Sequence, residues 1–188
     1  MELAIPYQKL EISKLHIIPQ TTGYLPFEYK DGDLTLHRSV ILTPVLKVVK
    51  YDDEKGKIEF EGDMTFISKM TALQDILKSV IFSQQKMFLN DNLTKDQIEF
   101  GFKALSYGSR FAVYIPSFIK STTYNKWTNR GIHVIDGKSS EWHSDSDTFK
   151  EGAEMRMAIK LGGIKIKKSP RGVNFFIDHQ ILNVWMCH

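Results

Sequence analysis

The chain has 188 residues, of which 42% are hydrophobic and 25% charged, and it carries a formal net charge of +3. This length is enough for one domain with a substantial core, and the composition is ordinary for a globular protein. The single cysteine, Cys187, excludes an internal disulfide and a thiolate zinc cluster, and no apolar run approaches the roughly 18 residues of a membrane span.

Residues 1–20 are predicted to form an N-terminal arm that includes a first strand, and residues 21–188 a single globular domain. Leu10 and Ile12 alternate with polar residues, and flanking prolines are typical of an edge or extended segment. Two interpretations stay open for this segment: an ordinary first strand, or an arm that docks on a neighbouring subunit. The candidate self-association residues at its apolar tip are Ile5, Pro6 and Tyr7.

Short strands are predicted next, beginning after the turn at Asp31-Gly32. Asp-Gly favours a tight hairpin turn because glycine adopts positive φ without strain. Apolar alternation indicates strands over 34–42, 45–49, 58–60 and 64–66.

The clearest helical pattern covers residues 71–89. Apolar side chains recur there at the spacing of one helix face, and Thr71 with Gln74 fits a capping box. The residues of that face are Leu73, Ile76, Leu77, Val80, Ile81 and Phe88. We therefore expect a long amphipathic helix packed on a sheet.

A short helix over 94–102 and a strand over 110–115 are predicted before a segment rich in basic and aromatic residues, 117–130. Lys126, Trp127 and Arg130 are its binding candidates. Cations and rings on one loop suit single-stranded nucleic acid, but they suit an anionic membrane surface equally well. A solvated loop with one anchoring tryptophan is the third interpretation.

Residues 154–161 fit two structures. Met155, Met157 and Leu161 belong to a strict alternation typical of a strand, whereas the abundance of Glu, Ala, Met, Lys and Leu favours a helix. A capping box at Thr148 and a glycine at 162 favour a second helix over 148–161.

The next segment, up to Ile177, is predicted to form a C-terminal β-hairpin with lysines on its outer face. The fold class expected from all of these elements is α+β, a single domain with a mostly antiparallel β-sheet. Four cations on the hairpin and its turn are binding candidates for lipid or nucleocapsid: Lys165, Lys167, Lys168 and Arg171.

No catalytic constellation emerges from the sequence. His133, His143, Asp145 and Asp147 are near one another in sequence, but they lack a helical histidine pair and a second ligand cluster. There is no glycine-rich phosphate loop and no nucleophile elbow. We therefore predict a protein that is not an enzyme and has neither a metal nor a cofactor.

The order of elements from Gly131 to Asp178 resembles the C-terminal part of rhabdovirus matrix proteins. It runs from a strand through Trp142 and an acidic, polar lead-in to a helix, a glycine, an apolar–lysine strand, a turn and an apolar strand. A strand and helix over 58–88 also sit where that family has them.

This resemblance implies a viral structural matrix protein that self-associates, binds and condenses the nucleocapsid, and links it to the inner face of the envelope. The implied partners are a second copy of the chain, the nucleocapsid and an anionic membrane surface. The implied locations are the virion interior, the host cytoplasm and the inner face of a membrane. The chain lacks the family's lysine-rich N-terminal tail and Pro-Pro-x-Tyr motif, which leaves membrane attachment and budding open. The alternative is a single-stranded nucleic-acid-binding protein with a β-barrel core.

Overall fold

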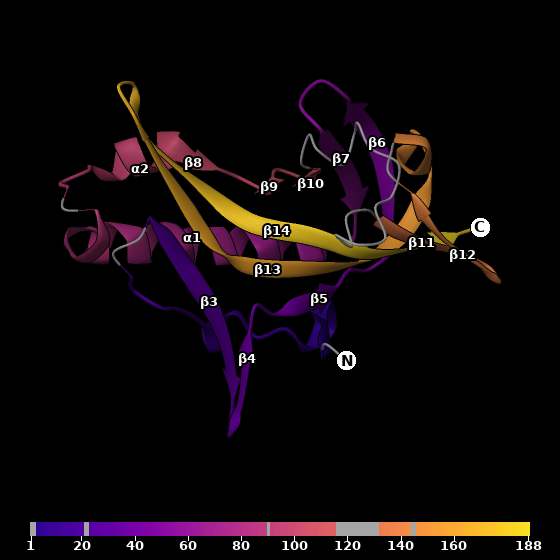
Figure 1. Cartoon of the computed structure of the whole chain (residues 1–188), viewed down its shortest axis with the longest axis horizontal. Coiled ribbons are helices and arrows are strands. Elements are labelled where there is room, and N and C mark those ends of the chain that lie inside the picture. The colour runs from indigo at the N-terminus through magenta and orange to yellow at the C-terminus, as the bar shows by residue number, and fades with distance from the viewer. Residues whose placement is uncertain (1–2, 21–22, 90, 116–131, 144–145) are drawn as a thin grey trace.

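Two long strands form the spine of the molecule (Figure 1). Strand β13, Glu154–Ser169, and strand β14, Gly172–Cys187, pair in antiparallel fashion along their whole length, with irregularities at 158/159 and 161/163. The computed structural model describes residues 3–20, 23–89, 91–115, 132–143 and 146–188, and side chains within these ranges except at 139–143 and 146–147. The predicted C-terminal hairpin is confirmed, and it is longer than the sequence pattern indicated.

The predicted helix over 148–161 is wrong. Only a short 3-10 turn, η3 (Ser146–Phe149), precedes β13, and residues from Glu154 onward are strand. Met155, Met157 and Leu161 are all buried, as the alternation required. The segment forms a strand because β14 and neighbouring strands offer hydrogen-bond partners to its backbone. This pairing outweighs the helix propensity of the residues, which is only a few tenths of a kcal/mol per residue.

The glycines at 162 and 163 do not end a helix; they let another strand approach β13. Strand β3, Tyr24–Asp31, pairs with β13 at Gly163. A Cβ atom on Gly163 would lie 2.3 Å from the carbonyl oxygen of Leu25 and 2.9 Å from Cα of Pro26. Only glycine fits at this contact between two backbones.

All fourteen described strands join one sheet, and most of their pairings are antiparallel. The central order is β12-β11-β14-β13-β6-β7-β10-β9. Parallel pairs join β1 to β5, β11 to β14 and β8 to β14. The remaining strands of this path are β6 (Leu46–Asp52), β7 (Lys57–Gly62), β9 (Ser106–Tyr107), β10 (Arg110–Tyr114), β11 (Ile132–Asp136) and β12 (Ser139–His143). The strands off the path are β1 (Ala4–Pro6), β2 (Leu15–Ile17), β4 (Leu34–His37), β5 (Val40–Leu42) and β8 (Phe102–Lys103).

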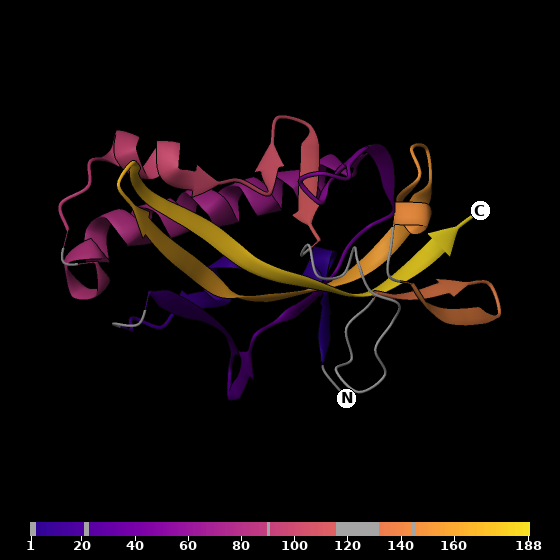
Figure 2. The same cartoon turned by 45° about the horizontal axis from the view of Figure 1, so that its top comes forward.

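The long helix α1, Met64–Phe88, begins earlier than predicted. Asp63 is its N-cap and accepts a 3.0 Å hydrogen bond from the amide of Phe66, so the predicted strand at 64–66 and the predicted capping box are wrong. Figure 2 shows α1 on one side of the β13–β14 hairpin. The predicted amphipathic face is buried at Leu73, Leu77, Ile81 and Phe88, whereas Ile76 is 42% exposed.

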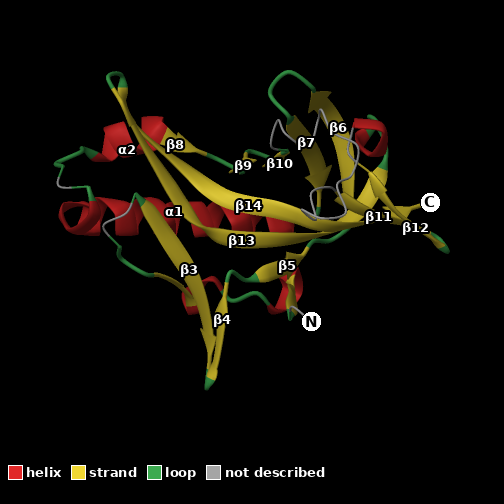
Figure 3. Cartoon of the chain, in the orientation of Figure 1, coloured by secondary structure: helices red, strands yellow, loops and turns green. Residues whose placement is uncertain are grey.

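The short helix α2, Lys95–Gly101, is confirmed, with a capping box formed by Thr94 and Gln97. Two 3-10 turns, η1 (Tyr7–Lys9) and η2 (Ile12–Lys14), lie in the N-terminal segment. Side chains from that segment, from both α-helices and from the sheet pack into one core. Figure 3 shows two α-helices beside a larger region of strands. The predicted α+β fold class is therefore confirmed. No helix among the described residues has the length and hydropathy of a membrane span.

Candidate functional site

A histidine side chain bridges two strands that are not neighbours in the sheet. Strands β14, β13, β6, β7 and β10 follow one another in the sheet, and the end of β10 comes back beside β14. There, Nε2 of His179 on β14 accepts a 2.8 Å hydrogen bond from the backbone N–H of Tyr114 on β10. The other ring nitrogen, Nδ1, lies 2.8 Å from the carbonyl oxygen of Ile177 and donates to it.

These two bonds fix the protonation state of the bridge. An imidazole that accepts at Nε2 and donates at Nδ1 is neutral. Burial lowers the pKa of His179, which favours the same neutral form. The hydrogen bond between β10 and β14 is therefore kept at neutral pH.

A groove with a volume of about 600 Å³ lies at this opening. Strands β10, β13 and β14 contribute to its lining, together with β8 and the turn between β6 and β7. We call it the basic groove and define it by four lysines, two aromatic residues and the bridging histidine: Lys55, Lys103, Lys165, Lys167, Tyr114, Phe176 and His179.

One aromatic ring of the basic groove stands between two lysines. Phe176 pairs with Lys103 of β8 on one side and with Lys165 of β13 on the other. Residues that pair across strands project from the same face of a sheet, so the three side chains form a row. The ammonium of Lys167 lies 5.3 Å from the centre of the Phe176 ring. The row places positive charge on both sides of an aromatic surface.

The four ammonium groups are not equally available. Lys165 pairs with Asp178 at 2.5 Å, and Lys55 lies 3.5 Å from Asp52. Lys103 and Lys167 form no ion pair within the part of the chain that the structure describes. Among the described residues of the lining, Asp178 is the one carboxylate beside four lysines, so these residues together carry a net positive charge.

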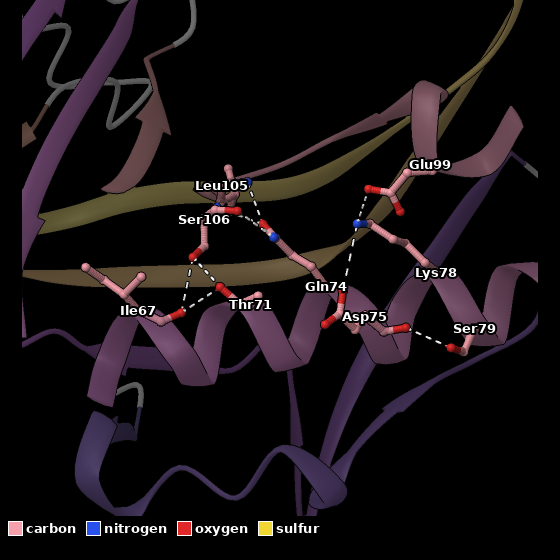
Figure 4. A network of polar contacts seen from close by, with 9 residues as sticks. All are labelled: Ile67, Thr71, Gln74, Asp75, Lys78, Ser79, Glu99, Leu105 and Ser106. Carbon is pink, nitrogen blue, oxygen red and sulfur yellow. Dashed lines mark hydrogen bonds and ion pairs between the residues drawn. The ribbon is translucent and has the colours of Figure 1, made fainter. Parts of the chain in front are cut away.

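A buried glutamine on α1 holds the segment that carries one wall of the groove (Figure 4). Oε1 of Gln74 accepts hydrogen bonds from the amides of Leu105 (2.6 Å) and Ser106 (2.8 Å), and Nε2 donates to the Ser106 carbonyl at 2.8 Å. The hydroxyls of Thr71 and Ser106 lie 2.7 Å apart. Thr71 and Gln74 were predicted to cap a helix. Instead they lie within α1 and hold the segment of Leu105 and Ser106 against it.

The helix α2 fixes the start of the same segment. Lys78 on α1 pairs with Glu99 on α2 at 2.7 Å, which ties the two helices together (Figure 4). At the end of α2, a Cβ atom on Gly101 would lie 2.2 Å from the Val173 carbonyl oxygen, so only glycine permits this approach to β14. Strand β8 follows directly, and its second residue, Lys103, thereby reaches its place beside Phe176.

The structure brings two of the four predicted hairpin cations to the groove. Lys165 and Lys167 are exposed and Ile164 is buried, so the predicted alternation is confirmed. Lys168 instead donates to the carbonyl of Leu89 at 2.8 Å, near the end of α1.

The fourth predicted cation lies at the tip of the hairpin. Arg171 is exposed in the turn between β13 and β14, and its amide donates to the hydroxyl of Ser169. The basic groove is therefore lined by Lys55 and Lys103, which lie outside the hairpin, and not by Lys168 and Arg171.

The predicted self-association residues contact their own chain. Ile5 is buried in the core within β1, which pairs with β5. The hydroxyl of Tyr7 donates to Asp63 at 3.1 Å, and the centres of the Tyr7 and Phe66 rings lie 5.9 Å apart in an edge-to-face arrangement. Self-association through this segment stays a prediction.

Other predicted candidates fall outside the described part of the chain. This holds for Lys126, Trp127 and Arg130, and for Asp145. Within the described residues, no group of three or more His, Cys, Asp or Glu side chains is placed to hold a metal ion.

Sequence reasoning missed five residues of the groove: Lys55, Lys103, Tyr114, Phe176 and His179. One signal for Phe176 was present. Two aromatic residues, 175 and 176, are adjacent in a strand, so one of them must face away from the core.

Comparisons with known proteins found no match to this chain. The chain matches no family model, no curated protein and no solved structure. The function is therefore argued from the groove.

Proposed function

We propose that the protein binds single-stranded nucleic acid in the basic groove. The observation that carries this proposal is a concave surface whose described lining combines four lysines with aromatic side chains and a single carboxylate. Lysine ammonium groups bind phosphate as point charges, and aromatic rings provide contacts that every unpaired base can use. In a double helix the base faces are stacked on one another, so a single strand fits this combination better.

The arrangement of strands supports the same proposal. Small, partly open five-stranded barrels are a frequent scaffold for binding oligonucleotides. Here five strands follow one another from β14 to β10, and the His179 side chain bridges the first and the last. This support is an analogy of architecture, and the residues of the groove carry the proposal.

The number of lysines sets the expected salt dependence. For a single strand, the slope of log affinity against log salt is about −0.7 for each phosphate neutralised. Four lysines are among the described residues of the lining, so together they contribute at most about −3 to this slope. Affinity should therefore fall with salt, but less steeply than for proteins that follow many phosphates.

The test is fluorescence anisotropy of a labelled oligothymidylate of about 15 nucleotides, measured over a range of salt concentrations. The variant Lys103→Glu/Lys167→Glu reverses the two lysines of the groove that have no ion pair among the described residues. The matched control is Lys9→Glu/Lys138→Glu, which makes the same change in net charge at two exposed lysines outside the groove.

We expect the groove variant to bind more weakly and to flatten the salt slope by about 1.4, because two phosphate contacts are lost. The control should keep the wild-type slope. Equal effects of the two double variants would mean that net charge alone drives binding, and the proposal would then be wrong.

The matrix-type function implied by the resemblance stays a prediction. It would use the same hairpin lysines toward anionic lipid or nucleocapsid. Vesicles of anionic lipid, tested with the same variants, separate the two functions.

A further inference from the structure

We infer that Phe176 is a stacking platform for one unpaired nucleobase, with Lys103 and Lys167 holding the adjacent phosphates. This inference rests on the proposed function and names the part of the groove that recognises the base. It separates nucleic acid from other polyanions, which the lysines alone cannot do.

The ring of Phe176 faces out of the core. Its neighbours in the strand, Phe175 and Ile177, are buried at 0% and 3% exposure, so the side chain between them projects from the opposite face. Phe176 is half-buried there and lines the groove. An aromatic side chain on the outer face of a strand contributes nothing to the core, but it offers a π-surface to a ligand.

The surroundings of the ring match a nucleotide. Lys103 and Lys165 flank the ring across the neighbouring strands, and Lys103, which forms no ion pair among the described residues, is available to a phosphate beside a stacked base. The Lys167 ammonium, 5.3 Å from the ring centre, occupies the ring face in the free protein. A base that stacks on Phe176 displaces this ammonium, which then becomes available to a phosphate.

The other aromatic residue of the groove is less suited to this role. The centres of the Tyr114 and His179 rings lie 6.1 Å apart in an edge-to-face arrangement. The backbone amide of Tyr114 also donates the hydrogen bond to His179 that bridges β10 and β14. We therefore assign the platform to Phe176 and a wall position to Tyr114.

The experiment compares two polyanions, an oligothymidylate and inorganic polyphosphate, which has the charge of a nucleic acid without bases. Phe176→Leu removes the aromatic face, and Phe176→Trp keeps it. The matched control is Phe100→Leu, because Phe100 is 90% exposed and lies outside the groove. Thermal unfolding of each variant establishes that the fold is retained.

We expect Phe176→Leu to weaken oligothymidylate binding by about tenfold or more and to leave polyphosphate binding unchanged. Phe176→Trp should bind the oligonucleotide at least as tightly as the wild type, and Phe100→Leu should match the wild type with both ligands.

Two results overturn the inference while the proposed function stands. The first is oligothymidylate binding that is unchanged in Phe176→Leu. The second is an equal loss for both polyanions, which would show that the ring only shapes the groove. If the wild type binds neither ligand, the proposed function itself is wrong.

Discussion

Replacing Gln74 with methionine tests the contact that holds the wall of the groove. Methionine has a similar length and keeps the apolar packing, but it makes none of the three hydrogen bonds of the glutamine side chain. The two amides and one carbonyl of Leu105 and Ser106 then lose their partner in a buried site.

The size of the effect follows from these three groups. A buried backbone group without a partner costs about 1–3 kcal/mol. Taking the lower value for each, Gln74→Met should reduce the free energy of unfolding by at least about 3 kcal/mol. This is a large share of the roughly 5–15 kcal/mol that stabilises a typical domain.

Urea denaturation followed by circular dichroism measures this free energy. The control is Gln84→Met on the same helix, because the Gln84 side chain is only partly buried and forms no hydrogen bond among the described residues. We expect the control to stay within about 0.5 kcal/mol of the wild type. A loss below about 1 kcal/mol in Gln74→Met would refute the assigned role of the network.

Two further predictions concern the bridge and the contact between strands. The pKa of His179 is lowered in the folded state, so its contribution to stability is complete above the unfolded value of 6.5 and declines as pH falls below it. The free energy of unfolding of the wild type relative to His179→Gln should therefore decrease as pH falls below 6.5, by up to about 1.4 kcal/mol per pH unit. Gly163→Ala should lower the free energy of unfolding by about 2 kcal/mol or more, because its Cβ would meet backbone atoms of β3. Gly162→Ala should cost less, because the atoms nearest to its Cβ would be side-chain atoms of Tyr24 and Asp178, which can move.

Each of these predictions has a contrary result. Identical pH profiles for the wild type and His179→Gln would mean that the imidazole does not titrate between the folded and unfolded states as described. A Gly163→Ala variant no less stable than Gly162→Ala would mean that β3 can move away from β13 at little cost.

The strand β13 shows where sequence reasoning succeeded and where it failed. The alternation of Met155, Met157 and Leu161 was the correct signal, and residue composition pointed the other way. Propensity acts locally, whereas three of the strands that pair with β13, namely β3, β5 and β6, are more than a hundred residues away in the chain. A single sequence does not show that such partners exist.

The prediction of where α1 starts was wrong for a related reason. The residues 64–66 alternate in polarity over a stretch too short to separate strand from helix, and the cap at Asp63 was overlooked. The helix itself was found because its apolar spacing extends over several turns. The pattern did not show that Ile76 faces solvent, since an apolar residue is as compatible with an exposed helix face as with a buried one.

The groove could be predicted only in part. The outward direction of Lys165 and Lys167 follows from strand geometry, and it was predicted from the hairpin alone. Lys55, Lys103 and His179 come from segments separated by long stretches of chain, and only the sheet pairing brings them together.

Photo-crosslinking of a 5-iodouracil-containing oligonucleotide, followed by mass spectrometry of the peptides, tests most directly whether the basic groove is the nucleic-acid site. The proposal predicts adducts at Phe176 or Tyr114, and their loss in Lys103→Glu/Lys167→Glu. Adducts at exposed aromatic residues away from the groove, such as Phe100, with none at Phe176 or Tyr114, would contradict it.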